Sequence, residues 1–394
     1  MDEPSERPLS VVWDPRFLDY DFGPSHPFDM RSRGAAAELL EASLSPDERA
    51  RLRWIRAVEP ASAEELERFH DAEYLAWLRH ASVLRRPVLL DRGDTPSFPG
   101  CYDASARIAA ATSTAVARAV EDGGVWFVPA GGLHHARRDG ASGFCVLNDV
   151  AVALAAPLAA GRRVAYVDLD AHHGDGVMYG YYGHGGLLDV DLHQDGRTLF
   201  PGTGDVGEIG DGDGAGRKVN LPLPPGSGDA WLLPLLRRVV LPLLAEFRPQ
   251  LLVVQHGLDG QDGDPLARLR YTARGYAEAD RLLFDLARSA RLPLVVTGGG
   301  GYRAESVSRG LAATGRRLGG LRSPGAADPL PPGWRQRFSD IFGREPPERW
   351  AEPSPSGPSP APPPGVEALV HRLEAVLGRR FPATASAPSA AGEA

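Results

Sequence analysis

The chain has 394 residues, of which 43% are hydrophobic and 24% charged, so it carries enough apolar material for a large globular core. Its formal net charge of -8 argues against a nucleic-acid partner, because neutralising phosphates needs clustered positive charge. No apolar run approaches the roughly 18 residues of a bilayer-spanning helix and the N-terminal segment is acidic, so we expect no membrane partner. Only two cysteines are present, so we expect a cytoplasmic protein with no disulfide framework.

Short apolar, β-branched runs alternate along the chain with segments of helical spacing. The runs predict strands at residues 125–128, 164–167, 187–192, 251–254 and 294–297. The helical spacing predicts helices at residues 63–80, 104–121, 229–247, 272–288 and 304–318. This alternation is typical of an α/β domain with a central, mostly parallel sheet flanked by helices, and we assign one catalytic domain to residues 1–350.

Two segments lack this pattern. Residues 195–216 are dense in Gly and Asp, which predicts a long loop that either shapes a site or is simply mobile. After Trp350 the composition changes to Pro, Ala and Ser, which predicts a linker over 351–364. A short amphipathic helix over 365–380 and a disordered tail over 381–394 are expected to follow.

The segment VDLDAHHGDG, residues 167–176, carries the strongest indication of chemistry. It follows a predicted strand directly, and ligands of open parallel sheets lie outside the carboxyl ends of the strands. Its density of aspartate and histidine favours a metal site over a solvated loop. Asp170 and His172 are two residues apart, so in an extended chain their side chains lie on the same side and can share a cation.

A nitrogen and carboxylate ligand set suits zinc or iron(II) better than calcium or magnesium, and it needs a third ligand from elsewhere. The expected donor is Asp259, which follows the strand predicted at 251–254. Three protein ligands would leave the open position that a hydrolytic metal needs for water. Asp262 and Asp264 are nearby alternatives, which we interpret as loop-capping side chains.

Two further loops after predicted strands carry reactive side chains. In GGLHHA, the adjacent His134 and His135 offer a base near neutral pH, and Asp168 and Asp175 are available to orient them. In GGGGY, four glycines allow close backbone approach, so the loop can bring the Tyr302 hydroxyl to a reacting carbonyl oxygen.

With these motifs together, the sequence resembles the zinc-dependent histone deacetylase family, and most of all its bacterial acetoin-utilisation branch. The resemblance extends from about Val11 to Gly320. It is carried by the ordered series YDFGPSHPF, GDTPSFPG, GGLHHA, GFCVLNDVAVA, VDLDAHHGDG, LFPGTGD, QHGLD, DPL and GGGGY.

The resemblance implies a single arginase-like α/β domain with about eight strands, and zinc as the cofactor. The implied zinc ligands are Asp170, His172 and Asp259. It also implies catalytic roles: His135 as general base and acid oriented by Asp175, His134 paired with Asp168 as an electrostatic helper, and Tyr302 as a hydrogen-bond donor to the substrate carbonyl.

The same matching implies a narrow tunnel for a lysine side chain. Phe144 and Phe200 would form its walls, Gly143 would line it through its carbonyl, and Asp94 would hold the substrate backbone at the rim. Leu266 stands at the tunnel mouth, where polyamine-specific relatives carry an acidic residue.

The family also implies structural potassium. The matching positions are Asp168, Asp170, His172, Asp191 and Leu192, and the aspartate at 191 is a departure, because the family has serine there. An aspartate can still bind potassium, so the site remains expected. A second, more exposed monovalent site would involve the backbone near Tyr181 and Leu187.

The implied activity is hydrolysis of N-acetyl-lysine to lysine and acetate, on an acetylated protein or peptide such as a metabolic enzyme of the acetyl-coenzyme A synthetase type. Acetylpolyamine or another small amide is the alternative substrate, and a non-catalytic acyl-lysine-binding module is the alternative class. A binuclear ureohydrolase is disfavoured, because its pattern has an aspartate where this chain has Gly174. The oligomeric state stays open, as does the choice between Arg31 and Arg33 as the internal-channel arginine of the family.

Overall fold

The computed structural model describes residues 7–351 and 361–382, and within them the central feature is one eight-stranded sheet. The strand order is β2-β1-β3-β8-β7-β4-β5-β6, and every neighbouring pair is parallel. The strands are β1 (Leu9–Val12), β2 (Leu52–Ile55), β3 (Val125–Val128), β4 (Val164–Asp168), β5 (Leu187–Gln194), β6 (Lys218–Leu223), β7 (Leu251–Gln255) and β8 (Leu294–Thr297). The α/β class is confirmed, and the sheet expected to be mostly parallel is parallel throughout.

The five predicted strands are all present, whereas β1, β2 and β6 were not predicted. β2 reads LRWI and β6 reads KVNLPL, so neither has the continuous β-branched run that marked the others. β6 lies at the edge of the sheet, where Pro222 is tolerated because its missing amide hydrogen is not needed by a further strand.

The helices cover the sheet and include two corrections to the predicted pattern. They are α1 (Arg31–Ala42), α2 (Pro46–Arg49), α3 (Ala63–Leu66), α4 (Ala72–Ala81), α5 (Cys101–Asp122), α6 (Asp149–Ala159), α7 (Asp175–Gly180), α8 (Asp229–Leu235), α9 (Leu241–Phe247), α10 (Ala273–Ser289), α11 (Ala304–Leu318), α12 (Pro332–Phe342) and α13 (Pro364–Leu377). The helix predicted at 63–80 is broken between α3 and α4, where Phe69 and His70 turn into the core. The helix predicted at 229–247 contains a π-turn at Leu236–Val240, flanked by prolines that lack an amide hydrogen.

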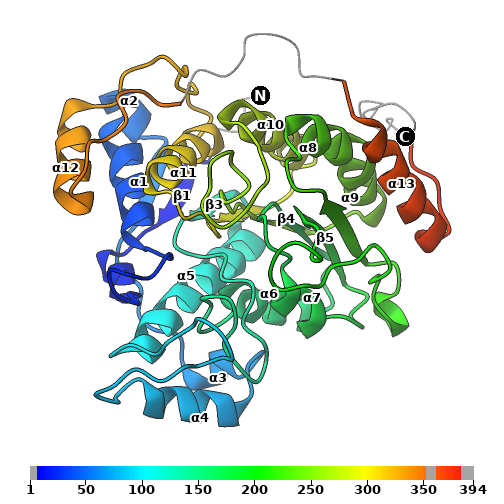
Figure 1. The fold of residues 1–394 in the computed structure, drawn as a ribbon, viewed down its shortest axis with the longest axis horizontal. Helices are drawn as coiled ribbons and strands as arrows, with labels where there is room; N and C mark the ends of the chain where they lie inside the picture. Colours follow the sequence, from blue (N-terminus) through cyan, green and yellow to red (C-terminus); the bar gives the residue numbers. More distant parts are fainter. Residues whose placement is uncertain (1–6, 352–360, 383–394) are drawn as a thin grey trace.

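The sheet separates two layers of helices (Figure 1). On one face α1, α8, α9, α10 and α11 pack against strand residues such as Val167 and Val254. On the other face α5, α6 and α7 pack against Tyr166 and Val253. Successive side chains of each central strand thus enter opposite hydrophobic cores, which is typical of parallel sheets buried on both sides. Within the described ranges, no helix combines the length and apolar character needed to cross a membrane.

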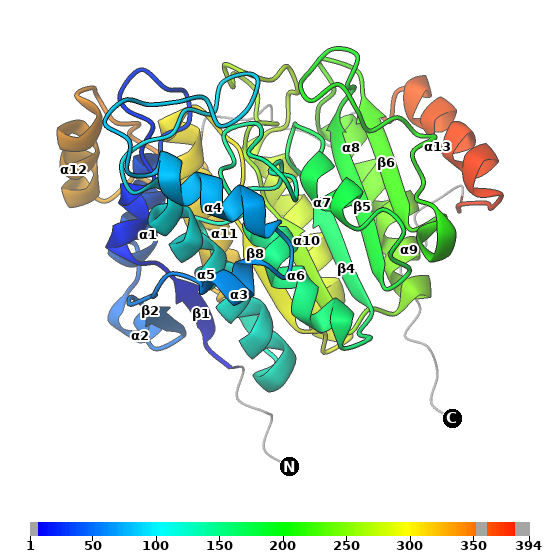
Figure 2. The same cartoon turned by 90° about the horizontal axis from the view of Figure 1, so that it is seen from below.

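The C-terminal helix α13 packs on the chain itself, beyond the β6 edge of the sheet (Figure 2). Its buried side chains include Val366, Leu369 and Leu373, and Arg238 forms an ion pair with Glu367. The helix ends at Leu377 rather than at 380, because Gly378 adopts a left-handed conformation with φ of 63°. Phe381, assigned to the predicted tail, is buried, while residues 352–360 of the predicted linker and 383–394 of the tail lie outside the described residues.

A buried ion-pair cluster joins α10 to α11. The Asp280 carboxylate accepts hydrogen bonds from His256 Nε2 at 2.6 Å, Thr314 Oγ1 at 3.0 Å and Arg317 Nε at 2.7 Å. Burial would raise the pKa of Asp280, but the neighbouring positive charges and these hydrogen bonds lower it to about 2.

We expect Asp280→Asn to lower the free energy of unfolding at pH 7 by about 3–5 kcal/mol, because it leaves buried charge without its partner. Since the folded-state pKa of Asp280 lies below the unfolded value of about 3.9, its contribution is present above that pH and is lost as the pH falls toward 2. Urea denaturation of both proteins at pH 7 and across this acidic window measures the difference. A difference that stays constant down to pH 2 would contradict the assignment.

Candidate active site

A cavity of about 320 Å³ opens beyond the carboxyl ends of the central strands. It brings together the five predicted tunnel residues and three reactive side chains from separate loops. Its lining comprises His26, Pro27, Asp94, His135, Gly143, Phe144, His172, Leu199, Phe200, Leu266 and Tyr302. His26, Pro27 and Leu199 were not assigned from the sequence, although His26 and Pro27 lie within the motif YDFGPSHPF.

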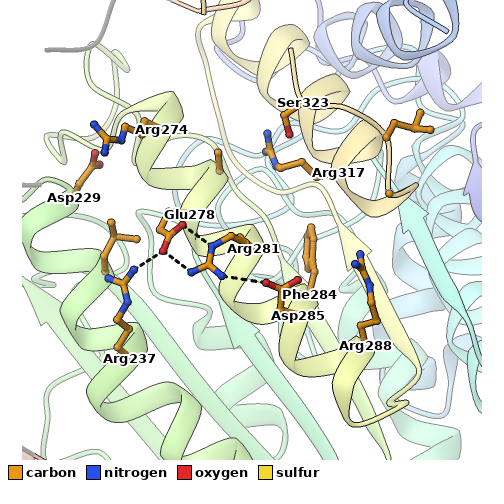
Figure 3. A pocket seen from close by; sticks show the side chains of 14 residues that line it. Asp229, Arg237, Arg274, Glu278, Arg281, Phe284, Asp285, Arg288, Arg317 and Ser323 are labelled. Carbon is orange, nitrogen blue, oxygen red and sulfur yellow. Dashed lines mark hydrogen bonds and ion pairs between the residues drawn. The ribbon is translucent and has the colours of Figure 1, made fainter. Parts of the chain in front are cut away.

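A larger cavity of about 710 Å³ lies along α10 and does not contain these residues. Figure 3 shows that four of its charged side chains are engaged with one another: Arg237 and Arg281 both pair with Glu278, and Arg281 also pairs with Asp285. Exposed ion pairs of this kind contribute little and do not by themselves indicate a ligand site.

The predicted metal ligands form a compact, buried cluster. Asp170, His172 and Asp259 each offer one ligand atom, and these atoms lie within 4.8 Å of one another. His172 Nδ1 is 3.3 Å from Asp170 Oδ1 and 2.9 Å from Asp259 Oδ2. The three side chains come from the loops after β4 and β7, which are neighbouring strands in the sheet.

In Asp170 and in Asp259, the carboxylate oxygen that does not face His172 accepts hydrogen bonds from amide groups. Asp170 Oδ2 accepts hydrogen bonds from Gln255 Nε2 and from the Gly300 backbone N–H, each at 2.7 Å. The Ala171 N–H donates to Asp259 Oδ1 at 2.7 Å. A side chain at Gly300 would place its Cβ 2.1 Å from Asp259 Oδ2, so only glycine allows this approach. Each carboxylate is therefore fixed with its remaining oxygen toward His172.

The electrostatics of the cluster fit a bound divalent metal. Burial raises the pKa of Asp259 to about 8, and the neighbouring Asp170 charge adds to this rise. Burial would also raise the pKa of Asp170, but the positive charge of His134 and the hydrogen bond to His172 hold it well below its usual value. Two fully buried carboxylates side by side are unfavourable without a cation, and a nitrogen and oxygen donor set of this size suits zinc or iron(II).

The histidine pair lies beside this cluster, and each ring has its own carboxylate. His134 Nδ1 is 2.8 Å from Asp168 Oδ2, His135 Nδ1 is 2.8 Å from Asp175 Oδ1, and the two Nε2 atoms are 3.1 Å apart. The structure therefore makes both pairings expected from the resemblance. Arg137, which the sequence analysis did not assign, donates to the other oxygen of Asp175 at 2.6 Å.

The two histidines differ in basicity. Burial would lower the pKa of His134, but the charges of Asp168 and Asp170 raise it to about 9. For His135, burial and the positive charge of His134 lower the pKa to about 4. At neutral pH the pair thus combines a charged ring with a neutral one that can accept a proton.

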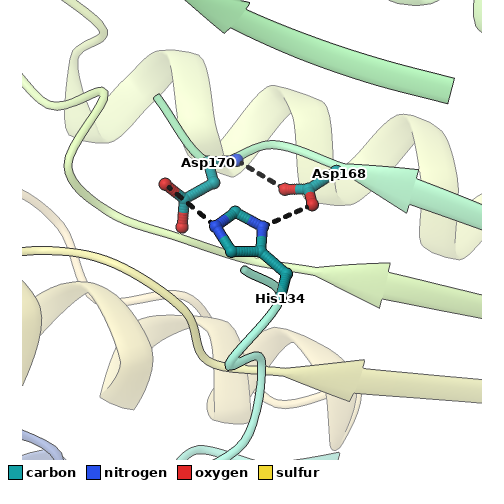
Figure 4. A group of neighbouring side chains, drawn as sticks. All are labelled: His134, Asp168 and Asp170. Atoms are coloured by element: carbon teal, nitrogen blue, oxygen red, sulfur yellow. Dashed lines mark hydrogen bonds and ion pairs between the residues drawn. The ribbon is translucent and has the colours of Figure 1, made fainter. Parts of the chain in front are cut away.

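His134, Asp168 and Asp170 also lie close enough to share a metal, and Figure 4 shows the ring between the two carboxylates. However, both Asp168 oxygens are already engaged: Oδ2 accepts from His134 and from Tyr166 at 2.6 Å, and Oδ1 accepts from the Asp170 N–H at 3.0 Å. We therefore favour the cluster of Asp170, His172 and Asp259.

Tyr302 closes the cavity from the loop between β8 and α11. Its ring centroid lies 5.8 Å from that of Phe144 and 6.2 Å from that of His172. Burial raises the pKa of Tyr302 well above its usual value, so the hydroxyl keeps its proton and can donate it in a hydrogen bond. Asp264 accepts the backbone N–H of Tyr302 at 2.9 Å, which makes it a loop-capping residue as expected.

The tunnel residues occupy the wall and mouth of the cavity. Phe144 adopts a positive φ of 67°, and its backbone N–H is fixed by Thr95 Oγ1 at 2.9 Å. The Phe200 ring lies 5.1 Å from that of His135, and Leu266 is partly exposed at the mouth. Burial raises the pKa of Asp94.

The structure decides between the two candidate channel arginines. Arg33 is buried and donates to the carbonyl oxygens of Gly299 at 2.5 Å and Gly301 at 3.1 Å, directly behind Tyr302. Arg31 lies at the surface in an ion pair with Asp29. Arg33 is therefore the internal arginine.

Gly174 also bears on the binuclear alternative. A Cβ at this position would lie 2.6 Å from Asp168 Oδ2 and 3.2 Å from Asp191 Oδ2. The position therefore has no room for the aspartate that a second metal would need.

Two of the expected potassium residues come from the strand next to β4. Asp191 stands opposite Asp168 on the neighbouring strand β5, and Leu192 follows it in that strand. The Gly174 N–H donates to Asp191 Oδ2 at 2.6 Å, while the buried Oδ1 has no hydrogen-bond partner among the described residues. Such an oxygen fits a bound monovalent cation, since buried polar atoms are normally satisfied.

Comparisons with known proteins agree with this geometry. Residues 26–318 match the family model described as the histone deacetylase domain. The chain is 32% identical over 353 residues to the acetoin utilization protein AcuC of Bacillus subtilis, which covers 87% of this chain and 89% of that protein. It is 35% identical to histone deacetylase B of Dictyostelium discoideum over 64% of this chain and 60% of that protein. Histone deacetylase 6 of Arabidopsis thaliana is 32% identical over 77% of this chain and 65% of that protein. The chain therefore belongs to the histone deacetylase family.

Proposed function

We propose that this protein is a zinc-dependent deacetylase that hydrolyses the amide of N-acetyl-lysine to lysine and acetate. The observation that carries this proposal is the cavity itself. One cavity is lined by His172 of the metal cluster, by His135 and by Tyr302, and these are a ligand, a base and a donor suited to amide hydrolysis.

Asp170, His172 and Asp259 would hold the metal, with zinc as the first choice and iron(II) as the alternative. When bound there, it would supply polarisation of the acetyl carbonyl and a water molecule of lowered pKa.

His135 and Tyr302 would carry out the proton transfer and charge stabilisation. The neutral His135 takes the proton of the attacking water at Nε2, held in orientation by Asp175 at Nδ1, and then returns it to the leaving lysine amine. The charged His134 beside it favours negative charge in the cavity. The Tyr302 hydroxyl donates to the carbonyl oxygen as negative charge develops on it.

The shape of the cavity supports an acetyl-lysine side chain as substrate. Phe144 and Phe200 bound a passage suited to an unbranched alkyl chain, and Asp94 at the rim can accept hydrogen bonds from a peptide backbone. Leu266 at the mouth offers no charge to a second amine. We therefore propose an acetylated protein, such as a metabolic enzyme of the acetyl-coenzyme A synthetase type, acting in the cytoplasm.

Release of acetate from an acetyl-lysine peptide and from N-acetylspermidine, by the metal-loaded and the metal-stripped protein, tests the function. We expect turnover of the peptide that stops when the metal is removed. Turnover of the polyamine alone would contradict the substrate, and no turnover of either by protein with bound zinc would contradict the deacetylase.

We also propose that Asp191 Oδ1 helps to hold a structural potassium ion. Replacing choline by potassium at constant ionic strength should raise the midpoint of thermal unfolding, because a ligand present at 100 times its Kd stabilises by about 2.7 kcal/mol. In Asp191→Ala this response should be largely lost. An unchanged response in the variant would contradict the assignment of Asp191 to the site.

A further inference from the structure

The turn between α7 and β5 holds a buried lysine at its centre. Lys218 begins strand β6, and its Nζ donates to the carbonyl oxygen of Leu187 at 2.9 Å and lies 3.4 Å from that of His184. The side chain is fully buried. Its ammonium group therefore faces two main-chain carbonyl oxygens of the turn.

This lysine is unusual in the chain. The chain has 43 lysine and arginine residues, and Lys218 is the single lysine among them. All the others are arginines. A guanidinium is a planar fork, whereas an ammonium is a compact point charge that can direct its three N–H groups to converging oxygens. The compact ammonium group thus suits the two converging carbonyl oxygens of this position.

A carboxylate completes the electrostatics of the position. Asp189 lies directly opposite Lys218 in the register of β5 and β6 and is buried. Its Oδ2 has no hydrogen-bond partner among the described residues, and burial raises the pKa of Asp189 to about 7, a rise that the positive charge of Lys218 opposes. Carbonyl oxygens at close range and a carboxylate on the neighbouring strand are surroundings that suit a monovalent cation.

The same turn is where the resemblance implied a second monovalent ion, on the backbone near Tyr181 and Leu187. The Leu187 carbonyl that such an ion would use is already the nearest partner of Lys218. An ion and an ammonium group cannot share this oxygen at close range without strong repulsion between like charges. The residues present therefore do not fit a bound ion.

We propose that the Lys218 ammonium replaces the second monovalent cation, so that the protein carries a covalently attached cation at this turn and binds no ion there. It follows that the described part of the chain retains one monovalent site, at Asp191. The proposal concerns the folded structure and does not depend on the catalytic activity.

Substitution of Lys218 should convert the position back into an ion site. In Lys218→Ala the cavity and its carbonyl oxygens remain, so we expect a loss of several degrees in the unfolding midpoint in choline chloride. Adding potassium, rubidium or methylammonium should restore most of the lost unfolding midpoint. This rise should exceed the rise that the same cation causes in the natural chain through Asp191. In the matched variant Lys218→Met an uncharged side chain fills the space. We expect a similar loss in the unfolding midpoint, which added cations should not restore. A folded Lys218→Ala protein that no cation restores would overturn the proposal.

Crystals soaked in rubidium give a second, direct readout. Anomalous scattering should show a rubidium ion near Leu187 in Lys218→Ala but not in the natural chain, while the Asp191 site is occupied in both. If Lys218→Ala does not fold, the natural chain alone still decides the question. A rubidium ion beside Lys218 would overturn the proposal, and its absence together with an occupied Asp191 site would support it.

Discussion

Tyr302→Phe is expected to lower kcat for acetate release from an acetyl-lysine peptide by about 10²–10³-fold, the usual cost of removing one donor to a developing oxyanion. The ring of Tyr302 packs beside Phe144 and His172, and phenylalanine keeps these contacts. The Gly298–Tyr302 loop also keeps its backbone bond to Asp170, so the metal cluster should be unaffected. Steady-state kinetics and the metal content of the purified variant measure both effects.

Tyr276→Phe is the matched control for this substitution. Tyr276 is buried on α10, and its hydroxyl has no hydrogen-bond partner among the described residues. Removing that hydroxyl should leave kcat unchanged. If Tyr302→Phe retained full activity, or if it lost metal together with activity, the role of Tyr302 as oxyanion donor would be wrong.

His135→Ala is expected to lower kcat by about 10²–10⁴-fold, the range typical of losing a general acid and base. His135 reaches the cavity through Nε2 while Asp175 fixes its Nδ1, and it does not contact the metal carboxylates directly. The variant should therefore bind one equivalent of zinc like the natural chain, as dialysis followed by elemental analysis can show.

Substitution of the exposed His371 on α13 controls for the loss of a histidine as such. It should leave the rate of acetate release unchanged. Comparable rates for His135→Ala and the natural chain would assign the base to another residue.

The sequence predicts those parts of the fold that have strong local patterns. Strands β3 and β8 have the bounds expected from their apolar runs, because both are buried on two sides and flanked by turn residues. Strands β1, β2 and β6 carry a polar residue within their runs (Ser10, Arg53 and Asn220), and their positions depend on pairing with distant segments, which no local pattern reveals. The break between α3 and α4 likewise depends on the burial of Phe69 and His70 in the tertiary core.

The residues of the candidate site could likewise be predicted only in part from the sequence. Asp170 and His172 could be paired from their spacing, and Asp259 from its place after a strand, because parallel strands end at one edge of the sheet. A histidine base and a Tyr302 donor followed from the loops that carry them, whereas the separate roles of His134 and His135 came from the resemblance, and all of these roles remain predictions. The supporting contacts of Gln255 and Arg137 were missed, and Arg33 could not be told from Arg31, since a single polar side chain carries no mark of its distant partner.

The most direct test of the metal cluster as the centre of the chemistry is a zinc titration of the metal-stripped protein, followed by acetate release from an acetyl-lysine peptide. The cluster of Asp170, His172 and Asp259 offers one set of ligands, so activity should rise linearly and reach its maximum at one equivalent of zinc. Activity that persists without metal, or that requires two equivalents, would contradict a single-metal deacetylase.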